Sequence, residues 1–212
     1  MNPLIKDRIT WLGQASVKIK SQGKIIYFDP YNMRARDNAD IVFITHSHHD
    51  HFSVNDLKLI ANQDTLIVAP EDCKERLSDN GFGNVVLIRP GIESLADNIS
   101  FSTIPAYNVV KTNFHPRSNN WVGYVVDIEG VRVYHAGDTE RIPEMKGIHC
   151  DVALIPLGQT YTMNSVREAA DAALDTGATT VIPIHYGMYE GTRHDADVFR
   201  EMLHDAVEVV IK

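Results

Sequence analysis

One short segment, in which four histidines follow a hydrophobic strand, constrains this chain more than any other feature. The β-branched run at residues 41–45 predicts the strand, and His46-Ser47-His48-His49-Asp50-His51 follows it directly. Because residues two apart in an extended segment point to the same side, His46 and His48 can present both imidazoles to one cation. His49 points the other way, and we interpret it as a surface residue or as a support for a neighbouring ligand.

The same segment can supply a second metal position. The chain must turn after the strand to begin a helix at Ser53, and this turn can carry Asp50 and His51 toward a position close to the first. Imidazole nitrogens together with a carboxylate suit zinc, iron or manganese better than calcium. The alternative is a histidine-rich polar loop without a metal, which the spacing disfavours.

Strand and helix patterns along the chain predict its fold class. β-Branched runs predict strands, and longer amphipathic stretches predict helices. The expected strands are residues 9–12, 16–20, 24–28, 41–45, 65–69, 85–88, 99–105, 121–128, 131–135, 152–156, 180–184 and 207–211, and the expected helices are residues 54–62, 71–80, 165–176 and 196–204. Hairpins gather at the start and in the middle, whereas helix–strand alternation marks the first and last thirds. This mixture predicts an α/β fold of one domain over residues 1–212, a four-layer αββα sandwich of two packed sheets with helices outside.

The charge balance and the cysteines limit the function classes. Twenty basic and 28 acidic side chains give a formal net charge of −8, which argues against a nucleic-acid-binding groove. No apolar stretch approaches the roughly 20 residues that cross a bilayer, and residues 1–10 lack the apolar run of a secretory signal. Cys73 and Cys150 are far apart and form no Cys-x-x-Cys pattern. We therefore expect a reduced, cytoplasmic protein with a small-molecule substrate, no nucleic-acid partner and no transmembrane segment.

The motif His-x-His-x-Asp-His after a hydrophobic strand resembles the signature of the metallo-β-lactamase fold superfamily, whose αββα architecture agrees with the predicted layers. Further motifs carry the resemblance down the chain in the family's order. They are Asp29-Pro30, His135-Ala136-Gly137-Asp138-Thr139 and Pro183-Ile184-His185-Tyr186-Gly187. The resemblance implies a metal-dependent hydrolase.

The resemblance also implies a set of ligands for two divalent cations, zinc first, with manganese or iron as alternatives. The first cation would take His46, His48 and a histidine from the middle of the chain, and the second would take Asp50, His51 and His185. Asp138 would bridge the two cations. Asp29 and His135 would support the ligands by fixing imidazole tautomers. A hydroxide held between the metals, oriented by Asp50, would then cleave an ester, lactone or phosphodiester bond.

The middle histidine is where the sequence departs from the family pattern. Relatives commonly carry it after Pro-Ala-x, but here Pro105-Ala106-Tyr107 is followed by Asn108, and the nearest histidine is His115. Either the loop is rearranged so that His115 completes the first site, or Asn108 or water occupies that position and the metal binds more loosely. A third interpretation gives His115 a role in binding substrate. We favour His115 as the metal ligand.

Within the superfamily, the closest resemblance is to the L-ascorbate-6-phosphate lactonase branch and to the phospholipase D that hydrolyses N-acyl-phosphatidylethanolamine. The segments that carry it, besides those above, are Trp11-Leu12-Gly13-Gln14, Trp121-Val122-Gly123-Tyr124 and Thr160-Tyr161-Thr162-Met163. This branch implies phosphorylated lactones, phosphodiesters or related esters as substrates. Lys111, Arg117 and Arg193 are loop cations that could hold a phosphate, although each is individually more typical of a solvated charge.

Two other functions compete with a hydrolase. A diiron oxidoreductase can use the same fold, but such relatives usually carry Glu where this chain has His48. A non-catalytic metal-binding domain is the other alternative, and Asn108 is the residue that favours it.

Overall fold

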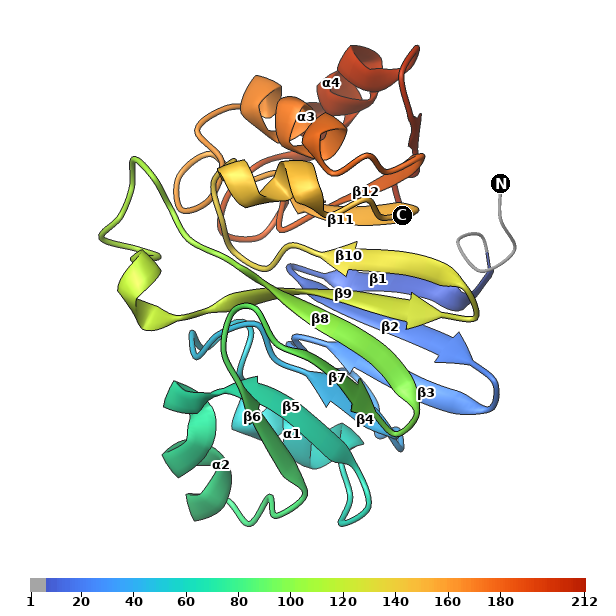
Figure 1. The fold of residues 1–212 in the computed structure, drawn as a ribbon, viewed down its shortest axis with the longest axis vertical. Coiled ribbons are helices and arrows are strands. Elements are labelled where there is room, and N and C mark those ends of the chain that lie inside the picture. The colour runs from blue at the N-terminus through green and yellow to red at the C-terminus, as the bar shows by residue number, and fades with distance from the viewer. Residues whose placement is uncertain (1–6) are drawn as a thin grey trace.

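Two β-sheets lie face to face in the computed structural model, which describes residues 7–212 (Figure 1). Residues 1–6 lie outside the described residues. The predicted absence of a secretory signal rests partly on these residues. The first sheet has its six strands in chain order. They are β1 (Ile9–Gly13), β2 (Ser16–Ser21), β3 (Lys24–Phe28), β4 (Ile41–Phe43), β5 (Leu66–Pro70) and β6 (Val85–Ile88). β1 to β3 pair antiparallel, and β3 to β6 pair parallel.

The second sheet has seven strands and the same division into an antiparallel and a parallel half. Its strands are β7 (Glu93–Ala96), β8 (Ile99–Pro105), β9 (Val122–Ile128), β10 (Val131–His135), β11 (Val152–Pro156), β12 (Thr180–Ile184) and β13 (Glu208–Val209). β7 to β10 pair antiparallel, and β10 to β13 pair parallel. β11 and β12 are buried along their whole length, as is typical of parallel strands that are covered on both faces.

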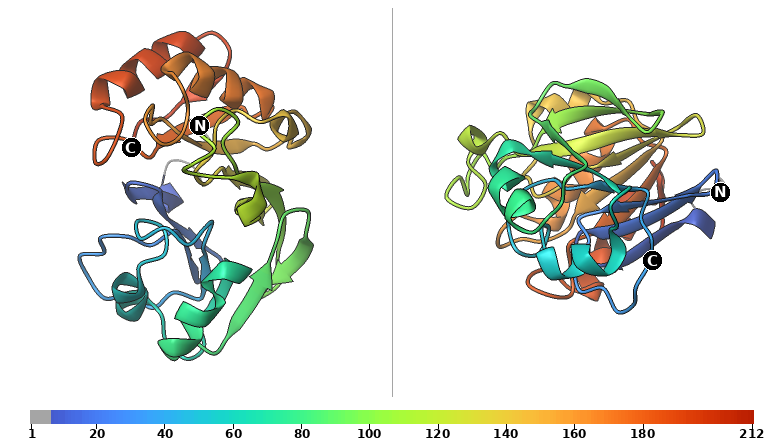
Figure 2. Two further views of the ribbon diagram at one scale, coloured as in Figure 1. Left: turned by 90° about the vertical axis from the view of Figure 1, so that its left-hand side faces the viewer. Right: turned by 90° about the horizontal axis from the view of Figure 1, so that it is seen from below.

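The helices cover the outer faces of the two sheets (Figures 1 and 2). They are α1 (Val54–Ile60), α2 (Lys74–Asp79), α3 (Val166–Asp175) and α4 (Arg193–Leu203), together with the 3₁₀ turns η2 (Glu71–Cys73), η3 (Arg117–Asn119) and η4 (Pro143–Gly147). Ser53 caps α1 by accepting a hydrogen bond from the amide of Asp56, which explains why the chain turns into a helix directly after the histidine motif.

Three apolar layers hold the four structural layers together. The middle one lies between the sheets, where Phe28 stacks on Phe43 and the Tyr124 hydroxyl donates across the sandwich to the Ile44 carbonyl at 2.7 Å. The outer two lie under α1 and α2 on one side and under α3 and α4 on the other. The predicted αββα sandwich is therefore confirmed.

The boundaries differ from the predictions in identifiable places. The expected helix at 71–80 begins as a 3₁₀ turn before α2, and α4 begins at Arg193 because Thr192 and Asp195 form a reciprocal cap. β7 was not predicted, because three of its four side chains are exposed on this edge strand and little apolar periodicity marks it. No helix among residues 7–212 is long and apolar enough to span a membrane.

The segments that carry the predicted metal ligands follow the carboxyl ends of strands at the same end of the sandwich. This end lies to the left in Figure 1 and faces the viewer in the left panel of Figure 2. The histidine motif follows β4, the segment with Asp138 follows β10, and His185 follows β12. Because these strand ends come from both sheets, the site lies where the two sheets meet.

Candidate metal centre

Four of the predicted ligands form a first cluster. His46, His48, His115 and Asp138 each offer one atom, and these atoms lie within 4.8 Å of one another. Nε2 of His46 is 3.0 Å from Nδ1 of His48, and Nε2 of His115 is 3.3 Å from Oδ2 of Asp138. Trp121 packs against the His46 and His48 rings and anchors its indole nitrogen on Asp72, so it walls one side of the cluster.

The remaining predicted ligands form a second cluster. Asp50, His51 and His185 also place one atom each within 4.8 Å of one another. Oδ2 of Asp50 is 3.5 Å from Nε2 of His51 and 3.8 Å from Nε2 of His185. The strand-to-helix turn thus carries Asp50 and His51 away from His46 and His48, as the sequence predicts, while His49 remains exposed at the surface.

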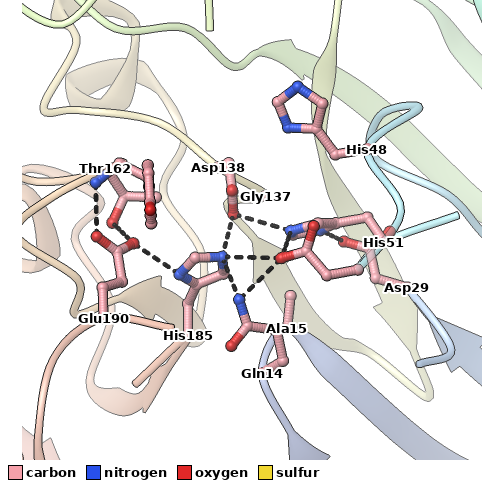
Figure 3. Close-up of polar contacts among 12 residues, drawn as sticks. Gln14, Ala15, Asp29, His48, His51, Gly137, Asp138, Thr162, His185 and Glu190 are labelled. Atoms are coloured by element: carbon pink, nitrogen blue, oxygen red, sulfur yellow. Dashed lines mark hydrogen bonds and ion pairs between the residues drawn. The ribbon is translucent and has the colours of Figure 1, made fainter. Parts of the chain in front are cut away.

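Asp138 lies between the two clusters. Its Oδ2 faces the first cluster, whereas its Oδ1 is 3.3 Å from Nε2 of His51 and 3.1 Å from Nε2 of His185 (Figure 3). The preceding Gly137 adopts φ +65°, and a Cβ there would lie 3.0 Å from Thr45. A glycine is therefore needed for the backbone to bring Asp138 this close.

The loop between β8 and β9 brings His115, and not Asn108, to the first cluster. The Asn108 side-chain amide donates to the Tyr161 carbonyl at 2.7 Å and to the Lys111 carbonyl at 3.2 Å. The backbone amide of Asn108 donates to the His115 carbonyl at 2.8 Å. Asn108 therefore stabilises the loop conformation that lets His115 reach Asp138.

The buried carboxylate of Glu140 stabilises the same loop. It accepts hydrogen bonds from the backbone amides of Val109, Val110 and Lys111 at 2.6–3.0 Å. Sequence reasoning missed Glu140, although it lies two residues after Asp138, because its partners are about thirty residues away.

The two predicted supporting residues act differently. Asp29 is fully buried, accepts from the amide and hydroxyl of Thr45, and lies 2.7 Å from Nδ1 of His51, which leaves Nε2 of His51 to face the cluster. His135 contacts no imidazole ligand by hydrogen bond in the described part of the chain; its Nε2 lies 2.8 Å from the Ala15 carbonyl, and its Nδ1 accepts from the Gly137 amide. His135 therefore supports Asp138 through the backbone rather than by fixing an imidazole tautomer.

Glu190 orients the His185 ring in the same way as Asp29 orients the His51 ring. This role of Glu190 was not predicted from the sequence. Its Oε1 is 2.8 Å from Nδ1 of His185, on the side of the ring opposite the cluster (Figure 3). The same buried carboxylate accepts from the amides of Thr160 and Tyr161 and from the Thr162 hydroxyl. One side chain thus orients a candidate ligand and shapes the loop over the site.

Gln14 is a further residue of the second cluster. The side-chain nitrogen of Gln14 donates to Oδ2 of Asp50 at 2.9 Å and lies 2.7 Å from Nε2 of His185. The backbone carbonyl of Gln14 accepts a hydrogen bond from the backbone amide of His185. Gln14 belongs to a motif that the sequence singles out, but no spacing rule predicts that it reaches a histidine 171 residues away.

The electrostatics of the site favour bound cations. Burial lowers the pKa of His46 and His48, so both imidazoles are neutral and free to coordinate. Burial opposes ionisation of Asp138, but the His185 and His51 imidazoles outweigh it and hold the pKa of Asp138 well below its usual range. Burial also disfavours a charged His51, yet Asp138 and Asp29 raise its pKa well above the ordinary value. The buried carboxylates are therefore stabilised by a positive charge at this site, which a proton or a metal ion can provide.

Unpartnered buried atoms show that the residues fit such ions. Nε2 of His51, Nε2 of His115 and Oδ1 of Asp138 are buried without a hydrogen-bond partner. Leaving such atoms unpaired is costly, and all three point into the clusters. Imidazole nitrogens with carboxylate oxygens match the preferences of zinc, and those of iron and manganese.

Comparison with known proteins identifies the family of the chain. The sequence profile of the beta-lactamase superfamily domain matches residues 8–185. The chain belongs to that superfamily. Within it, the chain is 34% identical to a UPF0173 metal-dependent hydrolase of Methanosphaerula palustris, over 96% of this chain and 94% of that protein.

Two solved structures share the fold. A metal-dependent hydrolase from Parabacteroides distasonis superposes with a TM-score of 0.85 at 31% identity, over 96% of this chain and 91% of that one. Igni18, a metallo hydrolase from Ignicoccus hospitalis, shares the fold with a TM-score of 0.80 at 23% identity, over 96% and 94% of the two chains. The predicted superfamily is thus confirmed, and this member is a metal-dependent hydrolase of the UPF0173 group.

The three loop cations that could hold a phosphate, Lys111, Arg117 and Arg193, lie outside the lining of the pocket over the clusters. A pocket of about 330 Å³ opens over both clusters, and no Lys or Arg is among the described residues that line it. Lys111 donates to the carbonyls of Met163 and Gln159, and Arg117 pairs with Glu144. Arg193 begins α4, away from the pocket lining. None of these three side chains lines the pocket, so its wall offers a phosphate none of them.

We expect Gly158→Ala to damage the site through Glu190. A Cβ at Gly158 would overlap the carboxyl group of Glu190, so this side chain must move away from His185. Loss of such a support lowers metal affinity by about 10- to 100-fold, measurable by competition with a chromophoric chelator. Gly147→Ala is the matched control, because its added Cβ meets nothing within 4 Å. Equal metal affinities in the two variants would contradict the role of Glu190.

Proposed function

We propose that this chain is a binuclear hydrolase that cleaves an ester, lactone or phosphodiester bond of a small molecule, with zinc as its preferred metal. The observation that carries the proposal is the position of Asp138, whose two oxygens face two separate ligand clusters. The proposed ligands are His46, His48, His115 and Asp138 for one cation, and Asp50, His51, His185 and Asp138 for the other. The single domain over residues 1–212 and the cytoplasmic location stay predictions.

The chain's own residues prepare the site for hydrolysis. When bound, divalent cations lower the pKa of water and stabilise negative charge on the reacting group, contributing several kcal/mol. Asp50 lines the pocket, and its Oδ2 accepts a hydrogen bond from Gln14, which orients the carboxylate. We assign Asp50 the role of accepting a proton from the attacking water and passing it to the leaving oxygen. Asp29 and Glu190 hold the His51 and His185 rings so that their Nε2 atoms face Asp138 and the second cluster.

Removal of metal should abolish turnover reversibly. Dialysis against a chelator is expected to reduce hydrolysis of 4-nitrophenyl acetate and of simple lactones by at least about 100-fold, and added Zn²⁺ or Mn²⁺ should restore it. Circular dichroism of the metal-free protein controls for unfolding. Unchanged activity in folded, metal-free protein would overturn the proposal.

The same preparation separates the two competing functions. Bound iron with consumption of dioxygen would indicate a diiron oxidoreductase instead. Two bound metals without hydrolysis of esters, lactones or bis(4-nitrophenyl) phosphate would indicate a metal-binding domain without this activity.

A further inference from the structure

The pocket wall outside the proposed ligands is aromatic and carries no fixed positive charge. Apart from the ligands, the lining residues are Gln14, His49, Phe114, Tyr161 and Tyr189. No lysine or arginine of the described chain belongs to the lining, and the formal net charge of the whole protein is −8. An anionic group remote from the reacting bond would therefore find no lysine or arginine in the pocket wall to pair with.

Three basic side chains on, or bonded to, the segments that carry the proposed ligands already have other partners. Lys111 holds the 159–163 loop through two carbonyls, the closer being Met163 at 2.8 Å. Arg117 pairs with Glu144 at 2.9 Å and lies over the Tyr107 ring. Arg76 donates to the carbonyls of Ser47 and Phe52. Releasing Lys111 or Arg76 to hold a phosphate would leave a partly buried carbonyl unpaired. Arg117 is 68% exposed, and its pair with Glu144 lies at the surface.

Aromatic rings flank both proposed metal positions. Phe114 precedes the ligand His115, and its ring meets that of Tyr161 edge-on, with centroids 5.0 Å apart. On the side of the second cluster, the Tyr189 hydroxyl is hydrogen-bonded to that of Tyr31, and the exposed His49 ring lies about 6 Å from both. Tyr161 and Tyr189 are 38% and 46% exposed, so a ligand can still cover them. Burying apolar area against such rings favours binding of an apolar group.

We propose that the substrate is a small neutral carboxylic ester or lactone whose apolar, preferably aromatic, group packs against Phe114 and Tyr161. This inference rests on the proposed hydrolytic function and narrows its substrate class. The pocket volume of about 330 Å³ is at the lower end for small-molecule sites, which suits a compact substrate. Water adds to the carbonyl carbon, the acyl carbon–oxygen bond breaks, and the leaving oxygen takes a proton from the water. The products are a carboxylic acid and an alcohol, or one hydroxy acid from a lactone.

Matched substrates test the charge preference with the wild-type, metal-loaded protein. We choose 4-nitrophenyl benzoate, the 4-nitrophenyl monoester of terephthalate with a free carboxylate, and bis(4-nitrophenyl) phosphate, because all release the same leaving group. The expected result is a kcat/KM for the benzoate at least about tenfold above that of either anion. A higher value for an anionic substrate would overturn the substrate class while leaving metal-dependent hydrolysis intact. No turnover of any substrate by protein with two bound metals would instead overturn the proposed function, and the inference with it.

Two variants test the aromatic wall. Tyr161→Ala and Phe114→Leu should each raise KM for 4-nitrophenyl benzoate, by about tenfold for Tyr161→Ala. Leu95→Ala removes a side chain that is 62% exposed on the edge strand β7, so it controls for loss of exposed apolar surface. An unchanged KM for the benzoate in Tyr161→Ala would contradict the inference, because this side chain lies in a loop where truncation leaves the core intact.

Discussion

Asp138→Asn is expected to leave a folded protein that binds fewer than two metal ions per chain and turns over ester substrates about 10³-fold more slowly. The amide keeps the size of the carboxylate but removes the charge that faces both clusters at 3.1–3.3 Å. Loss of several kcal/mol of charge stabilisation corresponds to a rate change of on the order of 10³-fold. Elemental analysis and kcat/KM on the same preparation measure both effects.

A matched control separates this effect from the general loss of a negative charge. Asp205→Asn removes a carboxylate that is 87% exposed in the carboxy-terminal region, so metal content and turnover should match those of the wild type. If Asp138→Asn retained two metals and full activity, Asp138 would not bridge the clusters, and the binuclear account would be wrong.

Glu190→Ala is expected to have the second largest effect, although Glu190 touches no metal position. The substitution leaves the amides of Thr160 and Tyr161 without their acceptor and Nδ1 of His185 without its partner. Removing one member of a buried charged group typically costs about 3–5 kcal/mol in the free energy of unfolding. The affinity of the second cluster for metal should fall by about 10- to 100-fold, because the His185 ring is no longer held.

Conservative replacement distinguishes support of His185 from support of the loop. Glu190→Gln retains an oxygen for either the loop amides or His185, and we expect it to recover most of the stability but only part of the metal affinity. Glu201→Ala, which removes an exposed carboxylate from α4, should change neither. Metal titration followed by thermal unfolding checks both quantities. A Glu190→Ala protein with wild-type affinity for two metals would show that Glu190 supports only the loop.

The parts of the site that local sequence could predict are those set by local geometry. The alternation of His46 and His48 and the turn before Ser53 follow from backbone geometry over a few residues, so their division between two clusters was predictable. Buried parallel strands such as β11 and β12 can be predicted from the sequence because each is a continuous apolar run. Edge strand β7 carries no such signal.

The unpredictable parts depend on contacts between distant segments. Glu190 meets the 160–162 loop because both follow neighbouring parallel strands, β12 and β11, of the second sheet. Gln14 meets His185 because strands of the two sheets end close together, and no short motif encodes either contact. The sequence also could not predict the partners of Lys111 and Arg117, because these partners lie on distant segments. The placement of His115 depends on a loop that hydrogen bonds of Asn108 and Glu140 stabilise, and loop conformation is not set by motif spacing.

The most direct test of the account is the metal stoichiometry of the protein. Chain purified without chelator, loaded with excess Zn²⁺ and desalted should contain two ions by elemental analysis, and His51→Ala should contain one, since only the second cluster loses a ligand. A wild-type content of one ion or none after loading would contradict the claim that these residues, gathered from both sheets, form two adjacent metal sites.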